Sequence, residues 1–201
     1  TQAAMLESMS ENLVNIDILT YELGDHFFLL ATQNPIEYEG TYPLPEAQLD
    51  RFLFRLQIGY PDFSDELSLL LDQQQDRLSQ VQQVIDAQDI EQLKHLVHSV
   101  YVDPQVANYA LQLVRETRSH DGILLGISPR AAVSFLKGAQ AFALTEGRSY
   151  VTPYDLQTIL PAAFGHRLLL KGGHTTTSDE KTRIILEQIV NRVPVPVRKR
   201  S

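Results

Sequence analysis

The first part of the chain carries short apolar segments of the kind that form strands. Leu13–Ile16 and Leu19–Glu22 lie on either side of a turn near Asp17 and predict a hairpin. Residues 27–31 are apolar at every position, which favours a strand buried on both faces of a parallel sheet. Residues 1–11 place apolar side chains at helical spacing, so we expect a helix there.

A loop and a short helix then lead to a further strand. Pro45 stands in the first turn of a helix expected over residues 46–50, a position where its missing N–H is not needed. Residues 52–58 favour a strand that ends at Tyr60-Pro61-Asp62. Two strands separated by a loop and a helix are typical of an α/β sheet.

From residue 61 onwards the spacing becomes helical. Asp103-Pro104, Ser128-Pro129 and Thr152-Pro153 each combine a favoured N-cap residue with a proline suited to the first turn, so each predicts a helix start. The expected helices run from 64 to 75, from 90 to 100, from 104 and from 129 onwards, from 153 to about 163, and from 179 to 193. Residues 172–177 read as a loop. The predicted fold class is α/β followed by all-α.

Composition narrows the class of protein. A chain of 201 residues with 43% hydrophobic content can bury one large core or two small ones. It contains no run of about 18 apolar residues, so we expect no membrane span. The absence of cysteine excludes disulfides and thiolate metal sites, and fits a cytoplasmic protein.

Charge divides the chain into an acidic and a basic part. Residues 1–103 hold four basic side chains against eighteen acidic ones, and residues 104–201 hold thirteen against seven. We interpret this asymmetry as two modules with different electrostatic roles, or as ordinary solvated surface. The basic residues are dispersed except for Arg198-Lys199-Arg200, so nucleic acid is not an expected partner.

Asn34 follows the apolar segment 27–31, three residues after its last position. In open α/β sheets, ligands bind outside the carboxyl ends of the strands, so this amide would face a site. An amide both donates and accepts hydrogen bonds and can hold a water beside a phosphate oxygen. The alternative is a turn-forming residue before Pro35.

Arg51 is one of the few cations in the acidic part of the chain. A guanidinium at the edge of a subunit can stabilise charge on a phosphoryl group in transfer, an effect worth about 10³-fold or more in rate. Alternatively, Arg51 could pair with Glu46 or Asp50, or brace Phe52. We interpret Arg55, within the expected strand, as structural.

Arg130 falls in the first turn of the helix that Ser128-Pro129 opens. A cation there opposes the helix dipole, at a cost of some tenths of a kcal/mol. The same helix end attracts phosphate, so an arginine beside it indicates an anion site. The alternative is a solvated arginine tolerated at small cost.

Other polar residues carry weaker signals. His95 and His98 share a helix face, but no third ligand is evident, so we expect no metal site. Gly172-Gly173 is followed by neither Gly-Lys-Ser nor Gly-Lys-Thr, so it is not a phosphate loop.

In their order along the chain these segments resemble the MoxR family of AAA+ ATPases, and the resemblance covers almost the whole sequence. The matching segments are 1–9 (the helix after the Walker B strand), 12–22 (the pre-sensor hairpin), 31–52 (sensor 1 to the arginine finger), 127–131 (sensor 2), and 150–156 with 165–168 (the later lid). Two features depart from the family: Ile18 stands where the hairpin turn usually has glycine, and the Gln-rich stretch 72–92 is not a family signature.

The resemblance implies an architecture: the C-terminal half of a P-loop AAA+ core sheet, followed by an α-helical lid bundle. Residues 1–60 would form the end of the core, with its helix, pre-sensor hairpin, sensor-1 strand, finger helix and last strand. Residues 61–103 would be connecting helices, and residues 104–201 the lid with sensor 2.

It also implies roles for the candidate residues. Asn34 would be sensor 1, Arg51 a catalytic finger acting on a neighbouring subunit, and Arg130 the sensor-2 arginine that contacts the nucleotide. The cofactors would be ATP and Mg²⁺. Their main binding motifs, Walker A and Walker B, are expected upstream of Thr1, so this chain alone should neither hold ATP tightly nor hydrolyse it.

The intact protein would be an ATPase that forms a homo-oligomeric ring, with a hexamer expected. Family members act as chaperone-like machinery that matures client complexes or inserts metals or cofactors into them, often beside von Willebrand factor A-domain proteins. Three alternatives stay open: a magnesium-chelatase-like AAA+ motor subunit, a non-catalytic interaction module, and a DNA-binding helical domain.

Overall fold

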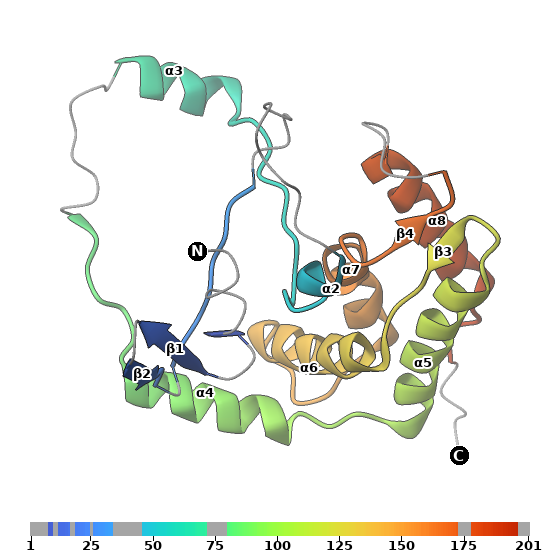
Figure 1. Ribbon diagram of the computed structural model, residues 1–201, viewed down its shortest axis with the longest axis horizontal. Helices are drawn as coiled ribbons and strands as arrows, with labels where there is room; N and C mark the ends of the chain where they lie inside the picture. Colours follow the sequence, from blue (N-terminus) through green and yellow to red (C-terminus); the bar gives the residue numbers. More distant parts are fainter. Residues whose placement is uncertain are drawn as a thin grey trace.

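The computed structural model describes residues 8–9, 12–16, 19–24, 26–33, 46–71, 80–172 and 178–196. Within these ranges a hairpin and two separate helices precede a bundle of longer helices (Figure 1). In the described residues no helix is both long and apolar enough to cross a membrane.

The hairpin forms where the sequence predicts it. Strands β1 (Leu13–Ile16) and β2 (Leu19–Glu22) pair antiparallel, with Leu13 opposite Glu22 and Ile16 opposite Leu19. The turn residues Asp17 and Ile18 lie outside the described residues. Of the helix expected over 1–11, the structure describes only residues 8–9, which are helical.

Two expected strands are not formed, and those predictions are wrong for this structure. Residues 27–33 and 52–60 have no regular secondary structure, and Phe28, Leu30 and Ile58 are 81%, 80% and 98% exposed. A central strand exists only when neighbouring strands satisfy its backbone and cover its faces. In the part of the chain that the structure describes, neither segment has such a neighbour.

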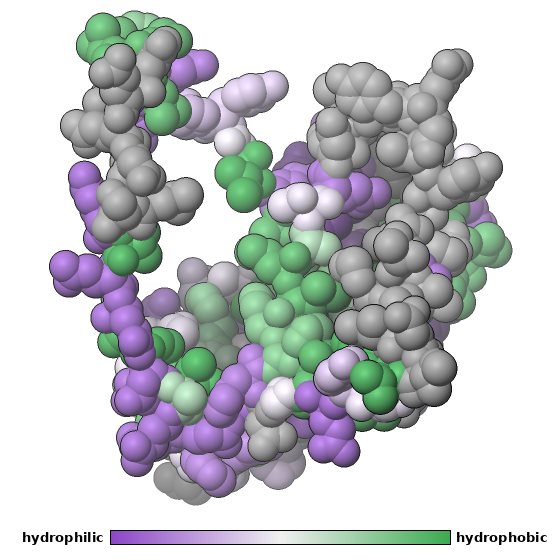
Figure 2. All heavy atoms as spheres, turned by 60° about the vertical axis from the view of Figure 1, so that its left-hand side comes forward, coloured by the Kyte–Doolittle hydropathy of each residue, from purple (hydrophilic) through white to green (hydrophobic). Residues whose placement is uncertain are grey.

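Two short helices occupy the middle of the chain. Helix α2 (Glu46–Leu49) matches the expected finger helix, and α3 (Phe63–Leu71) begins one residue before the expected 64–75, of which residues 72–75 lie outside the described residues. Asp62, rather than Ser64 or Asp65, occupies the capping position, because its carboxylate accepts the Asp65 N–H at 2.9 Å. Figure 2 shows hydrophobic side chains gathered on α3, where no residue is buried.

The remaining elements form the helical bundle. They are α4 (Ala87–Ser99), α5 (Pro104–Ser119), β3 (Ile123–Leu125), α6 (Pro129–Thr145), α7 (Pro153–Phe164), β4 (Leu169–Leu170) and α8 (Ser178–Arg192). Strands β3 and β4 pair antiparallel, a small sheet that the periodicity did not predict. Helix α4 packs against α6, while α5, α6, α7 and α8 share the core.

Local sequence signals account for the helix starts. Asp103, Ser128 and Thr152 are the N-caps of α5, α6 and α7, and each side-chain oxygen accepts a main-chain N–H two or three residues further on. Helix α4 begins three residues before the predicted start, because Asp86 and Asp89 form a reciprocal capping box.

Large apolar side chains fill the space between these helices. The rings of Phe135 on α6 and Phe164 on α7 lie 4.6 Å apart at an angle of 52°. Around them lie other side chains with almost no exposed surface: Leu113, Val114, Ile127, Leu156, Leu160 and Ile189. This core gives the bundle a fixed surface on which the segment before it is held.

Candidate functional site

Residues 50–57, which we call the strap, lie across the helical bundle in place of the expected strand. The N–H of Arg55 donates to the carbonyl of Ala162 on α7 at 2.9 Å. The ring of Phe54 packs on the bundle core beside Gly138 on α6. A Cβ at Gly138 would lie 2.9 Å from Phe54 Cζ, so this glycine allows the close approach. The strap is therefore placed by α6 and α7.

The side chain of Arg167 holds the strap, because it binds main-chain carbonyls of the strap on both sides of Arg51. Its guanidinium donates to carbonyl oxygens of Asp50 at 3.3 Å, Phe52, Leu53 at 3.1 Å, and Ala163 on α7. Its Nε lies 3.2 Å from Asp50 Oδ1, an ion-pair distance without hydrogen-bond geometry. Only 3% of this side chain is exposed. Because a guanidinium presents its donors in a rigid plane, it fixes the carbonyls that it binds.

His166 adds a further contact to the strap. Its Nε2 lies 3.0 Å from the carbonyl oxygen of Phe52, and since a carbonyl only accepts, Nε2 carries the proton. Burial lowers the pKa of His166, the hydrogen bond to Phe52 opposes this, and the neighbouring Arg167 lowers the pKa further. The imidazole is therefore neutral at pH 7.

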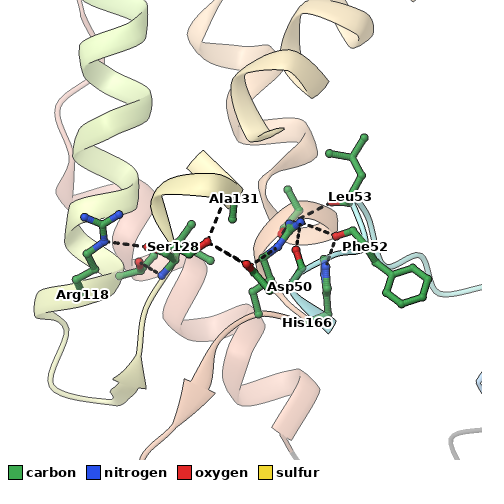
Figure 3. Close-up of polar contacts among 11 residues, drawn as sticks. Asp50, Phe52, Leu53, Arg118, Ser128, Ala131 and His166 are labelled. Carbon is green, nitrogen blue, oxygen red and sulfur yellow. Dashed lines mark hydrogen bonds and ion pairs between the residues drawn. The ribbon is translucent and has the colours of Figure 1, made fainter. Parts of the chain in front are cut away.

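Asp50 connects the strap to the start of helix α6. The hydroxyl of Ser128 donates to Asp50 Oδ2 at 3.1 Å and accepts the Ala131 N–H at 3.1 Å. Figure 3 shows Ser128 between these two partners, with His166 reaching Phe52 beside them. One hydroxyl thus caps α6 and binds a carboxylate 78 residues earlier in the chain.

The turn before Ser128 is itself fixed by helix α5. The hydroxyl of Thr117 accepts the Ile127 N–H at 3.0 Å, and Arg118 Nε donates to the Ile127 carbonyl at 2.9 Å (Figure 3). Gly126 passes so close that an added Cβ would lie 2.7 Å from the Thr117 carbonyl oxygen. The position of Ser128 is therefore set by α5 as well as by α6.

Helix α8 contacts the far end of the strap. Arg55 forms an ion pair with Asp179, and Gln57 Nε2 donates to the same carboxylate at 2.8 Å. This pairing supports the interpretation of Arg55 as structural. Both side chains of the ion pair are half exposed, so the contact adds to the placement of the strap more than to stability.

The structure places two of the three candidate residues. Arg51 is half-buried at the end of α2, next to Asp50, and Arg130 is exposed in the first turn of α6, two residues after Ser128. Within the described ranges, no hydrogen bond or ion pair engages the Arg130 side chain. Asn34 lies outside the described residues. Arg51 thus directly follows one partner of the Asp50–Ser128 hydrogen bond in the chain, and Arg130 stands two residues after the other.

Sequence reasoning missed the residues that make this arrangement. Asp50 was considered only as a partner for Arg51, and Ser128 only as an N-cap. A signal for Arg167 existed, because Gly165-His166-Arg167 follows a strongly apolar helix and places a cation where burial is expected. Its partners on the strap could not be inferred, since they are main-chain carbonyls more than 100 residues away.

The chemistry of the site suits an anion. The unpaired guanidinium of Arg130 at the positive end of α6 can bind a phosphate group, and this end of a helix attracts one. Among the described residues no cluster of His, Cys, Asp or Glu could hold a metal ion. Within the described residues, the candidate site therefore offers a cation, the Arg130 guanidinium, and no metal ligands.

Comparisons with known proteins identify two AAA segments in this chain. The family described as "ATPase family associated with various cellular activities (AAA)" matches residues 1–54, and the AAA lid domain matches residues 115–189. This chain is 34% identical in sequence to a candidate ATPase from Cytophaga hutchinsonii and superposes on its crystal structure with a TM-score of 0.84. The match covers 98% of this chain and 62% of that one.

Curated relatives are similar along almost all of this chain. YeaC of Bacillus subtilis (strain 168) is 43% identical over 99% of the chain, and the chaperone MoxR1 of Mycobacterium tuberculosis is 33% identical over 97% of it. The chain spans 62% and 54% of the lengths of these two proteins. Protein MoxR of Paracoccus denitrificans is 24% identical over 96% of the chain. The predicted fold class is confirmed, and the chain belongs to the MoxR family of AAA+ ATPases, with an AAA segment at residues 1–54 and an AAA lid at residues 115–189.

Proposed function

We propose that this chain supplies the arginine finger and the lid of an ATPase that works as a ring of identical subunits. The observation that carries the proposal is the hydrogen bond between Asp50, which precedes Arg51, and Ser128, which lies two residues before Arg130, because it joins the two segments that carry these arginines. Two arginines on segments joined in this way suit a reaction in which charge moves on phosphate oxygens.

The two arginines have different roles in this proposal. Arg130 contacts the nucleotide of its own subunit from the start of α6, and Arg51 reaches the nucleotide of the next subunit. Asn34 orients the attacking water. This chain contains no Gly-x-x-x-x-Gly-Lys-Ser/Thr motif, so we assign the phosphate loop and the Mg²⁺ ligands to a part of the AAA+ core outside this sequence.

Exposed apolar residues support the presence of such a core in the working protein. Phe28, Leu30, Leu56 and Ile58 are each at least 76% exposed, although their segments have the composition of buried strands. Exposed apolar runs of this kind mark surfaces that another part of a protein covers. We propose that they pair with the remainder of the core sheet, and that the assembled ring is a hexamer.

The process served is proposed from the relatives. One of them is named a chaperone, and by analogy this protein would couple ATP hydrolysis in the cytoplasm to the maturation of client complexes, including metal or cofactor insertion, with a von Willebrand factor A-domain protein as a partner. This step rests on family analogy rather than on the site.

ATP hydrolysis by the full-length protein tests the two roles. Arg51→Ala should lower kcat by about 10³-fold with unchanged nucleotide affinity, because a trans-acting finger contacts mainly the transition state. Arg130→Ala should raise the Kd for nucleotide. Arg183→Ala is the matched control, since it removes an exposed cation that pairs with Glu187 on α8 and forms no hydrogen bond or ion pair with the strap among the described residues.

Mixed rings decide whether Arg51 acts across subunits. Subunits that carry Arg51→Ala should regain activity when mixed with subunits that have an intact finger but an inactivated phosphate loop. Unchanged kcat in Arg51→Ala would refute the finger. An intact ring without any hydrolysis would favour the alternative function, a non-catalytic interaction module.

A further inference from the structure

We propose that Asp50 and Arg167 are positioning residues that hold the Arg51 finger from the lid of the same subunit, so that the Ser128–Asp50 hydrogen bond links the start of the sensor-2 helix to the finger offered to the next subunit. This inference rests on the proposed function and adds residues that the finger and sensor roles do not include. According to this inference, the lid sets the position of the finger.

The first step of the argument is the main chain around Arg51. Arg167 binds the carbonyls of Asp50 and Phe52, the residues on either side of Arg51, and also that of Leu53. His166 binds the Phe52 carbonyl as well. The direction in which the Arg51 side chain leaves the backbone is therefore set by two buried residues that follow α7.

The second step is the carboxylate of Asp50. It accepts the Ser128 hydroxyl at 3.1 Å and lies 3.2 Å from Arg167 Nε, so it connects the two parts of the lid that contact the strap. A half-buried carboxylate with a cation and a hydroxyl as partners resists displacement, since moving it would leave Arg167 buried without its counter-charge.

The third step is the double role of Ser128. The same oxygen that accepts the Ala131 N–H of α6 donates its hydrogen to Asp50. A movement of the first turn of α6 therefore moves the donor of this hydrogen bond. Since Arg130 lies in that turn, nucleotide contact at Arg130 and the position of Arg51 are mechanically connected within one subunit.

A second buried ion pair in the bundle shows what a purely structural pair looks like. Arg148 and Asp155 join the turn after α6 to the start of α7, and the strap has no contact with them among the described residues. Substituting Asp155 should weaken the bundle without moving Arg51. Asp155→Asn is therefore the matched control for Asp50→Asn.

The test is ATP hydrolysis and nucleotide binding by the full-length protein, with a fluorescent non-hydrolysable ATP analogue as the binding probe. Asp50→Asn should lower kcat by about 10- to 100-fold, the loss expected from a misplaced catalytic group, with an unchanged Kd for the analogue. Combined with Arg51→Ala it should cause no further loss, because the finger is already absent. Asp155→Asn should lower Tm and leave kcat unchanged.

Ser128→Asp provides a second test if Asp50→Asn fails to fold. Aspartate is as good an N-cap as serine, so α6 keeps its start, but two carboxylates now face each other and kcat should fall. Adding Asp50→Asn in this background should restore part of kcat, because the amide introduced at position 50 can donate to the carboxylate introduced at position 128. A further loss in this double variant would contradict the link.

The results for Arg51→Ala and Asp50→Asn distinguish a failure of this inference from a failure of the proposed function. If Arg51→Ala leaves kcat unchanged, the finger itself is wrong, and the positioning role falls with it. If Arg51→Ala lowers kcat while Asp50→Asn does not, or if their losses multiply in the double variant, the finger stands and the positioning role is overturned.

Discussion

Arg148 holds the fully buried carboxylate of Asp155 with both ends of its guanidinium. Its Nη1 donates to Asp155 Oδ2 at 2.7 Å, its Nη2 contacts Oδ1, and Thr152 donates its N–H to Oδ2 at 2.7 Å. Burial alone would raise the pKa of Asp155, but the hydrogen bonds from Arg148 and Thr152 outweigh it and keep the pKa below its ordinary value. This pair joins the turn after α6 to the start of α7.

Asp155→Ala should destabilise the bundle strongly. Removing one partner of a buried ion pair costs about 3–5 kcal/mol, and here the α7 capping box is lost as well. Urea unfolding measures the effect. Glu187→Ala, which breaks the exposed pair with Arg183, is the control and should cost less than about 1 kcal/mol. A comparable loss in both variants would show that the pair contributes little.

Mild acid should weaken the attachment of the strap through His166. Burial lowers the pKa of His166 from its ordinary 6.5, so below that pH the unfolded chain binds more protons than the folded one. Stability should therefore be full above pH 6.5 and fall as the pH drops from there towards the lowered pKa.

Urea midpoints between pH 8 and pH 5 measure this dependence. His166→Gln, whose amide can still donate to the Phe52 carbonyl, should flatten the curve in this window. The contribution of Asp155 to the free energy of unfolding is lost only below its ordinary pKa of 3.8, so the effects of the two groups occur in different pH ranges. An identical slope in His166→Gln would assign the effect to another group.

Gly126→Ala should displace the turn that carries Ser128. The added Cβ would lie 2.7 Å from the Thr117 carbonyl oxygen, a main-chain atom that cannot move without distorting α5. We expect a loss of about 1–3 kcal/mol in the free energy of unfolding, as for other overpacked sites. Gly59→Ala is the control, because nothing lies within 4 Å of the added atom. Equal stability in the two variants would mean that the turn yields.

Arg167→Lys should release the strap although it keeps the charge. Lysine offers a single ammonium group and cannot bind the carbonyls of Asp50, Phe52 and Leu53 with one planar fork. Amide hydrogen exchange should therefore become faster at Arg55, whose N–H is bound to Ala162. Exchange at Ile127, bound to Thr117, is the internal reference and should not change. Unchanged protection at both amides would show that Arg167 is not needed to hold the strap.

The helix starts and the hairpin could be predicted from sequence because their determinants are local. A cap such as Thr152 acts on an N–H three residues away, and the proline after it needs only its own backbone geometry. The starts of α3 and α4 were predicted one and three residues too late, because Asp62 and Asp86 were not recognised as their N-caps. Those signals were equally local and were present in the sequence.

By itself, the sequence determined the family, the order of the helices, and the candidate arginines at Arg51 and Arg130. Only the tertiary structure decided that residues 50–57 lie as a strap on the bundle, because an apolar segment becomes a strand only where another strand pairs with it. It also decided that Asp50 meets Ser128 across 78 residues. Such a contact depends on how α6 and α7 pack, and no spacing along the chain encodes it.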